Sequence, residues 1–203
     1  MDVRMSANSE LLKRKQKVVQ DAIWNAAIDL FGEKGFDDTT VDDIASTAGV
    51  SQRTFFRYFA SKSDLMGQGM LVYGEALRAA IKASPKSAQA FDVLRRAVLE
   101  VAAMVASSPR THDVIAIVVN YPAAREAQLS RMDQIEQSVA QAYSSRMKKG
   151  RENELASRLL AGLTFTILDE TMRLWSVNGA PSITVVAERV MKRLCSLVAG
   201  ADA

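Results

Sequence analysis

The sequence contains one cysteine and one histidine among its 203 residues. A single cysteine, Cys195, excludes an internal disulfide framework, and so few soft ligands leave no cluster with metal-binding spacing. No glycine-rich phosphate loop follows a strand-like segment, and no catalytic constellation is evident. We therefore expect no enzymatic activity, no cofactor and no metal site.

Long apolar runs are also missing. The longest uninterrupted run, Val114 to Val119, is far shorter than the roughly 20 residues that cross a membrane. The first ten residues are polar and lack the apolar centre of a signal peptide. Together with the single cysteine, these features predict a cytoplasmic protein with no membrane partner.

Strand periodicity is the third absence, because apolar residues recur at helical rather than alternating spacing. We predict an all-α fold of about nine helices, with residues 1–10 disordered and a first helix from Leu11 to Lys34. A fourth predicted helix contains Gly67, Gly69 and Gly74, each of which costs about 1 kcal/mol relative to alanine. Close helix packing and a soft connection both remain open as explanations for these glycines.

One stretch, residues 39–65, predicts two short helices joined by a tight turn. Thr40 is a suitable N-cap, and Asp43 stands where a capping box places its acidic residue. Gly49 follows the first helix at the position that favours a left-handed residue, and Ser51 caps the second helix. This order of elements is typical of a DNA-binding helix-turn-helix. With the preceding helix, it predicts a three-helix DNA-binding domain at residues 1–60.

The second helix of this motif begins with side chains that suit DNA. Gln52 can pair bidentately with adenine, and Arg53 can pair with guanine. Side chains suited to phosphates are Thr40, Ser51, Thr54, Arg57, Tyr58 and Lys62. The net charge of +3 is too small to indicate nucleic-acid binding by itself. Two basic clusters nevertheless flank the motif, namely Lys13, Arg14, Lys15 and Lys17, and Arg53, Arg57 and Lys62.

The same stretch resembles the TetR family of bacterial transcriptional repressors. The matching residues are Leu30-Phe31, Lys34-Gly35-Phe36, Thr39-Thr40-Val41, Ile44-Ala45, Ala48-Gly49-Val50-Ser51, Thr54-Phe55-Phe56-Arg57-Tyr58-Phe59, Lys62 and Asp64-Leu65. The resemblance implies contacts to the DNA backbone from Thr40, Thr54, Phe56, Tyr58 and Lys62. The family commonly has tyrosine where this chain has Phe56, so that ring either packs against sugars or belongs to the core.

For residues 61–203 the resemblance implies an effector-binding and dimerisation domain. It implies a homodimeric repressor, paired through the last two helices (155–175 and 183–198), that a small molecule releases from a palindromic operator. Some relatives with a similar recognition helix are described as sensing acyl-coenzyme A or other hydrophobic compounds. Polar candidates for an effector pocket are His112, Asn120, Tyr121, Arg125, Thr164, Thr166, Asp169 and Trp175. A DNA-binding regulator or architectural protein without an effector remains the alternative.

Overall fold

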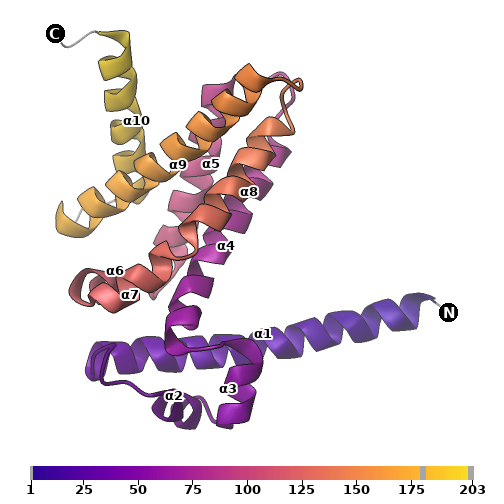
Figure 1. Cartoon of the computed structure of the whole chain (residues 1–203), viewed down its shortest axis with the longest axis vertical. Helices are drawn as coiled ribbons and strands as arrows, with labels where there is room; N and C mark the ends of the chain where they lie inside the picture. The colour runs from indigo at the N-terminus through magenta and orange to yellow at the C-terminus, as the bar shows by residue number, and fades with distance from the viewer. Residues whose placement is uncertain (1, 179–181, 201–203) are drawn as a thin grey trace. The chain divides into compact units, whose positions relative to one another are not determined.

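Ten helices run through the residues that the computed structural model describes, 2–178 and 182–200, and no strand occurs among them. The predicted all-α fold is confirmed (Figure 1). The helices are α1 (Asp2–Glu33), α2 (Val41–Thr47), α3 (Gln52–Tyr58), α4 (Lys62–Ala83), α5 (Ala90–Ser107), α6 (Thr111–Asn120), α7 (Pro122–Leu129), α8 (Met132–Ser144), α9 (Arg151–Asn178) and α10 (Ile183–Ala199). None of them is long and apolar enough to cross a membrane.

The helices differ in two ways from those that the sequence predicts. Helix α1 begins at Asp2 rather than Leu11 and continues through residues that we expected to be disordered, because no glycine or proline interrupts residues 2–31. Helix α7 is not among the approximately nine helices that the sequence predicts. It begins at Pro122, whose fixed φ and missing N–H suit the first position of a helix.

The chain divides into two compact units. Unit 1 contains Met1–Gly67 and Asp113–Gln128, and unit 2 contains Gln68–His112 and Leu129–Ala203. Segment 113–128 belongs to unit 1 because the apolar side chains of α6 and α7 are buried in its core. The functional boundary at residues 60/61 remains a prediction.

The core of unit 1 forms around the apolar face of α1. Ile23, Ala27 and Phe31 recur at helical spacing and are completely buried. Buried side chains from α2, α3, the start of α4, α6 and α7 complete the core, including Ile44, Phe55, Phe59, Leu65, Ile117 and Ala124. The chain leaves α1 at Gly35, whose φ is +90°. A Cβ atom there would also lie 2.8 Å from the Tyr121 hydroxyl oxygen, so Gly35 has both a conformational and a steric requirement.

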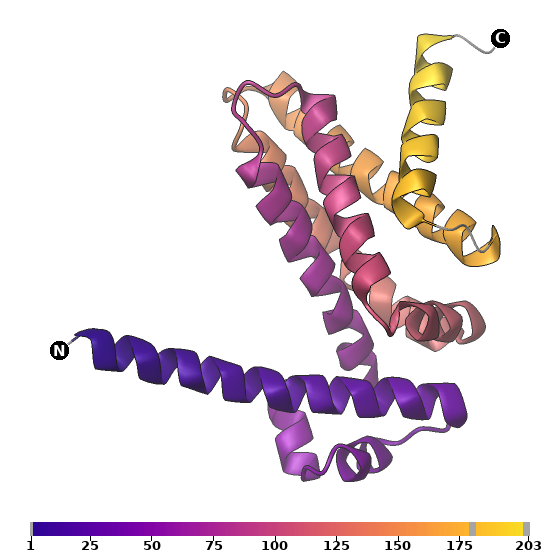
Figure 2. The ribbon, with the colours of Figure 1, turned by 180° about the vertical axis from the view of Figure 1, so that it is seen from behind.

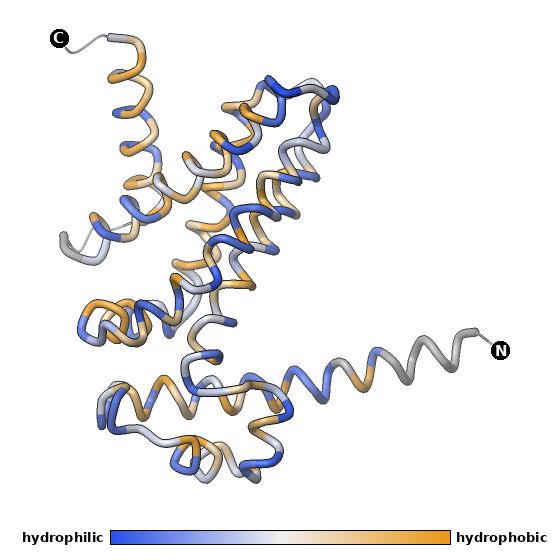
Figure 3. Tube along the Cα trace, in the orientation of Figure 1, coloured by the Kyte–Doolittle hydropathy of each residue, from blue (hydrophilic) through white to orange (hydrophobic). Residues whose placement is uncertain are grey.

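Unit 2 is a bundle built from most of α4 together with α5, α8, α9 and α10. Helices α8 and α9 pack side by side, and α10 packs against α5 and α9 (Figure 2). Apolar residues on the facing sides of these helices form one core, visible as orange stretches within the bundle in Figure 3. A Cβ atom on Gly74 would lie 2.6 Å from Cγ2 of Ile135, so close packing against α8 explains this one of the three glycines in α4.

Candidate nucleic-acid interface

The start of α2 carries the capping box that the sequence predicts. The Asp43 backbone N–H donates to the Thr40 hydroxyl at 3.1 Å, and the Thr40 backbone N–H donates to the Asp43 carboxylate at 3.0 Å. The second of these bonds is the main reason that the pKa of Asp43 falls to about 2. The Thr40 hydroxyl and the Lys34 ammonium, 3.1 Å from the carboxylate, lower the pKa further.

The turn after α2 has the predicted glycine geometry. Gly49 has a φ of +67°, which is unfavourable for residues with a Cβ atom. The Gly49 N–H donates to Ser46 at 3.1 Å and the Val50 N–H donates to Ala45 at 2.9 Å, which together form a Schellman motif. Val50 is half-buried against the core of unit 1. These contacts fix the angle at which α3 leaves the turn.

Helix α3 is positioned from both its beginning and its inner face. Ser51 caps it, because the Ser51 hydroxyl accepts the Thr54 backbone N–H at 3.1 Å. Phe55 is completely buried, and the centroid of its ring lies 5.7 Å from the ring centroid of the buried Phe59. A helix of seven residues is too short to be stable alone, so this anchoring maintains it.

The outer face of α3 carries four exposed side chains: Gln52, Arg53, Phe56 and Arg57. Their spacing (i, i+1, i+4, i+5) places them on one side of the helix, opposite Phe55. Phe56 is 53% exposed, which excludes the interpretation that it belongs to the core. The three polar members are suited to base edges and phosphates, and the exposed ring can pack against sugars.

Two side chains of this face are already held within the protein. The Gln52 amide donates to the Asp42 carboxylate at 2.8 Å, so reading an adenine requires Gln52 to exchange that bond. The Arg57 guanidinium donates to the Tyr58 hydroxyl at 3.3 Å and lies 4.9 Å from its ring centroid. The Arg57 contact restricts the rotamers of that side chain before any ligand arrives and so reduces the entropy lost on binding, whereas the Gln52 bond has to be broken first.

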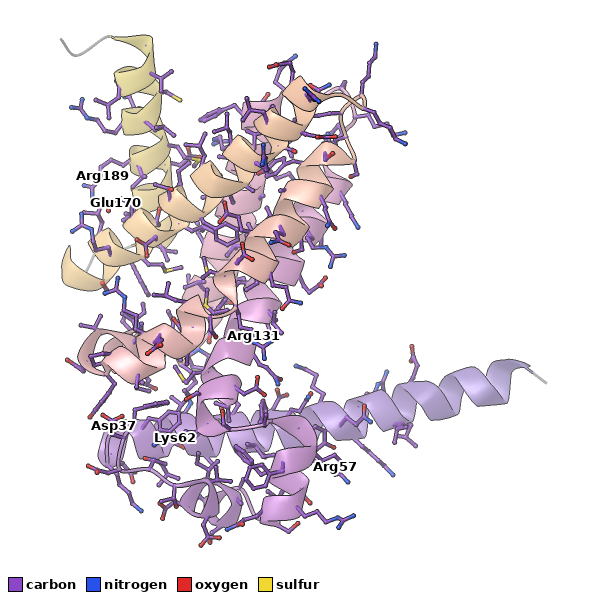
Figure 4. All side chains as sticks on the ribbon, viewed as in Figure 1. Asp37, Arg57, Lys62, Arg131, Glu170 and Arg189 are labelled. Atoms are coloured by element: carbon purple, nitrogen blue, oxygen red, sulfur yellow. The ribbon has the colours of Figure 1, made fainter. Side chains whose placement is uncertain are left out.

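Lys62 has a different environment from the other predicted phosphate ligands. Its ammonium donates to the carbonyl oxygens of Phe36 at 2.6 Å, Asp37 at 2.8 Å and Thr39 at 3.0 Å. These three bonds use all three donors of the ammonium and join the start of α4 to the segment after α1. Figure 4 labels Lys62 beside Asp37. A phosphate bound by Lys62 would have to displace one of these carbonyls.

The candidates for an effector pocket are divided between the two units. Asn120, Tyr121 and Arg125 lie in unit 1, where Tyr121 packs against the core. The other candidates lie in unit 2: His112, Thr164, Thr166, Asp169 and Trp175. Among these, the His112 and Trp175 rings are in contact, with centroids 4.5 Å apart. Thr166 is exposed and its hydroxyl donates to the Gly162 carbonyl of its own helix at 2.9 Å.

Unit 2 contains buried hydroxyls, of which the sequence singled out only that of Thr164. The oxygens of Tyr143 and Thr164 lie 2.9 Å apart, and burial raises the pKa of Tyr143 to about 12. Thr171, two helical turns after Thr164 on the same face of α9, is completely buried and its hydroxyl has no hydrogen-bond partner. Its position within an apolar stripe of α9 is the sequence signal that could have identified it. No group of potential metal ligands occurs among the side chains that the structure describes.

Comparison with known proteins gives a family match in unit 1. Residues 23–68 match the model of the bacterial regulatory proteins of the tetR family. The HTH-type transcriptional regulator TcmR of Streptomyces glaucescens is 37% identical over 75 residues, which cover 37% of this chain and 33% of TcmR. The chain thus spans less than half the length of the curated relatives it matches.

Solved structures extend the likeness to the fold of most of the chain. The fatty acid degradation regulator FadR from Bacillus halodurans matches with a TM-score of 0.61 and 19% identity, covering 87% of this chain and 94% of FadR. FadR from Bacillus subtilis, solved in complex with stearoyl-CoA, matches with a TM-score of 0.59 and 22% identity, covering 85% and 96%. At this identity the likeness concerns the fold alone. The family match itself is therefore a property of the segment that contains the helix-turn-helix, residues 23–68, which is a TetR-family segment.

Proposed function

We propose that this protein is a sequence-specific DNA-binding regulator of transcription whose α3 enters the major groove. The observation that carries the proposal is the exposed face of α3, where Gln52, Arg53, Phe56 and Arg57 project from a capped and anchored helix. Gln52 and Arg53 stand at its N-terminal end, the part that reaches base edges in this mode of binding. Thr40, Ser51, Thr54 and Tyr58 flank this face and supply hydroxyls for phosphates. Such a regulator acts in the cytoplasm, where the DNA is.

The regulator acts, in this proposal, as a homodimer on a near-palindromic operator. One seven-residue recognition helix makes few base contacts, so specificity requires two copies on two half-sites. Helix α9 supports this by carrying an exposed apolar stripe of Leu155, Leu159 and Leu163, spaced four residues apart. Helix α10 adds exposed Val185, Leu197 and Val198. A two-fold contact between α9 and α10 of two copies would cover these side chains.

The signal in this proposal is a small hydrophobic molecule that binds in unit 2 and releases the operator, which makes the protein a repressor. The core of unit 2 is apolar and contains the hydroxyls of Tyr143, Thr164 and Thr171. Ordinary ligand sites combine apolar walls with a few polar groups of this kind. The Bacillus subtilis FadR structure contains stearoyl-CoA, and an acyl-CoA is therefore one compound class to examine.

The DNA-binding part of the proposal is tested by selecting operators from a random duplex library with the full chain. Arg53→Ala should then weaken binding by about 1–3 kcal/mol and relax selectivity at one base pair in each half-site. Lys86→Ala, which removes an exposed charge from unit 2, is the control and should leave the base profile unchanged. An Arg53→Ala profile identical to that of the wild type would contradict the proposed role of α3.

The effector part is tested separately by thermal-shift screening with a broad metabolite panel that includes acyl-CoA thioesters. A compound present at 100 times its Kd should stabilise the protein by about 2.7 kcal/mol. It should also dissociate the selected duplex. If no compound in the panel stabilises the protein, the alternative of a regulator without an effector is favoured.

A further inference from the structure

The N-terminal arm of α1, residues 10–18, is not explained by the packing of unit 1. Among the described side chains of α1, that of Val19 is the first that packs against the core. Before it, every described side chain from Glu10 to Val18 is exposed, with Lys13 not among those described. The helix thus continues well beyond the residues that stabilise unit 1. Exposed helices are marginal in water, so a binding partner would account for the arm better than folding does.

The charge of the arm is concentrated where it leaves the core. Residues 11–20 contain four basic residues and no acidic residue, so this stretch alone carries +4, compared with +3 for the whole chain. Arg14, Lys15 and Lys17 are all exposed. The nearest acid after them is Asp21, whose carboxylate lies 3.5 Å from the Lys17 ammonium. Because those two side chains are 77% and 58% exposed, this pair is weak and another anion can replace it.

The arm continues on the side of unit 1 where α3 lies. In both views of the ribbon, α3 stands between α2 and the side toward which α1 extends to its N-terminus (Figures 1 and 2). Figure 4 shows Arg57 of α3 on that same side. At 1.5 Å per residue, Arg14 lies about 7.5 Å beyond Val19 along the helix axis, or roughly two base-pair rises of 3.4 Å. Its long side chain adds to this reach.

We infer that the arm is a second DNA contact, in which Arg14, Lys15 and Lys17 bind phosphates of duplex outside the bases read by α3. The inference rests on the proposed function, because the arm is brought to flanking DNA by a bound α3. Charge complementarity identifies the partner: a stretch of +4 without an acid, beside a basic recognition helix, fits the phosphate backbone. Backbone contacts of this kind raise affinity on any sequence and leave base selectivity to α3.

The test compares the wild type with Arg14→Gln/Lys15→Gln/Lys17→Gln on two duplexes that share one selected operator. One duplex ends at the operator, and the other continues for ten base pairs on each side. Glutamine keeps high helix propensity, so the arm should remain helical. On the long duplex, the variant should lower the slope of log affinity against log salt by up to about 2.7 for each arm of the dimer, at about 0.9 for each of its three lost contacts. On the short duplex, the two proteins should bind almost equally.

The control variant is Lys148→Gln/Lys149→Gln/Arg151→Gln, which removes the same charge from exposed positions of unit 2. It should keep the wild-type slope on both duplexes, which excludes an effect of net charge alone. Equal slopes for the arm variant and the wild type on the long duplex would overturn the inference. So would an equal loss in the arm and control variants. If the wild type binds a selected operator, the proposed function is supported whether or not the arm variant changes the slope. If the wild type selects no duplex, the proposed function itself is contradicted.

Discussion

The three carbonyl contacts of Lys62 predict that this residue acts mainly in folding. We consider Lys62→Met, which retains an unbranched apolar stem and removes the ammonium. The substitution leaves the carbonyl oxygens of Phe36, Asp37 and Thr39 without their donor. Phe36 and Thr39 are buried, so water replaces that donor poorly. The segment between α1 and α2 should lose its attachment to α4.

The magnitude follows from the contacts. Hydrogen bonds with a charged partner contribute about 1.5–3 kcal/mol each, and a cation over an aromatic face adds roughly 0.5–1 kcal/mol. The Lys62 ammonium lies 4.9 Å from the Phe36 ring centroid. The free energies of hydrogen bonds that share one donor group are not additive, and the Lys62 ammonium is well hydrated in the unfolded chain. We therefore expect a loss of about 2–4 kcal/mol, which corresponds to a Tm lower by roughly 5–15 °C for a chain of this length.

Two measurements separate this role from the phosphate contact that the family resemblance implies. Thermal denaturation should show the large loss for Lys62→Met, while the exposed Lys82→Met in the same helix should change stability by less than about 0.5 kcal/mol. Operator titrations below the Tm of the variant should give the wild-type salt slope. An unchanged Tm together with a slope smaller by about 0.9 for each subunit of the dimer would refute our reasoning and assign Lys62 to a phosphate.

Four further results are expected. Gly74→Ala should destabilise the protein by about 1–3 kcal/mol, because the added Cβ atom would clash with Cγ2 of Ile135. In urea denaturation, the double variant Gly74→Ala/Ile135→Ala should lose less stability than the sum of the losses of the two single variants, and strict additivity would contradict the contact. Thr171→Val removes an unpartnered buried hydroxyl and should stabilise by about 1 kcal/mol, so a lower Tm would be inconsistent with the observed burial. The pKa of Asp43 is about 2 in the folded protein against an ordinary 3.8, so the stability that its carboxylate contributes is present above pH 4 and is lost as the pH falls toward 2. The difference in Tm between the wild type and Asp43→Asn should therefore narrow over that range. A constant difference would exclude the capping carboxylate as the source of the difference in Tm. Light scattering at micromolar concentration should give twice the 22.2 kDa chain mass, and a particle of one chain mass would rule out the dimer.

Features that depend on a few neighbouring residues could be predicted from the sequence. The capping box of Thr40 and Asp43, the left-handed Gly49 and the cap at Ser51 were all predicted and are confirmed. Each is determined by side-chain and backbone chemistry within four residues, so no knowledge of the rest of the fold is needed. The all-α class was also predictable, because apolar spacing is a local property repeated along the chain.

Only the tertiary structure decided what distant residues do to one another. The exposure of Phe56 depends on which side of α3 faces the core of unit 1, and the sequence left both possibilities open. The partners of Lys62 are 23 to 26 residues away, and the contact of Tyr121 with Gly35 joins residues even further apart. Such contacts arise when amphipathic helices bury their apolar faces against one another. Several arrangements of the helices can achieve this burial, so the sequence pattern alone does not say which residues meet. The sequence therefore determined the helix-turn-helix motif, whereas packing determined which of its side chains remain exposed for the DNA contacts that we propose.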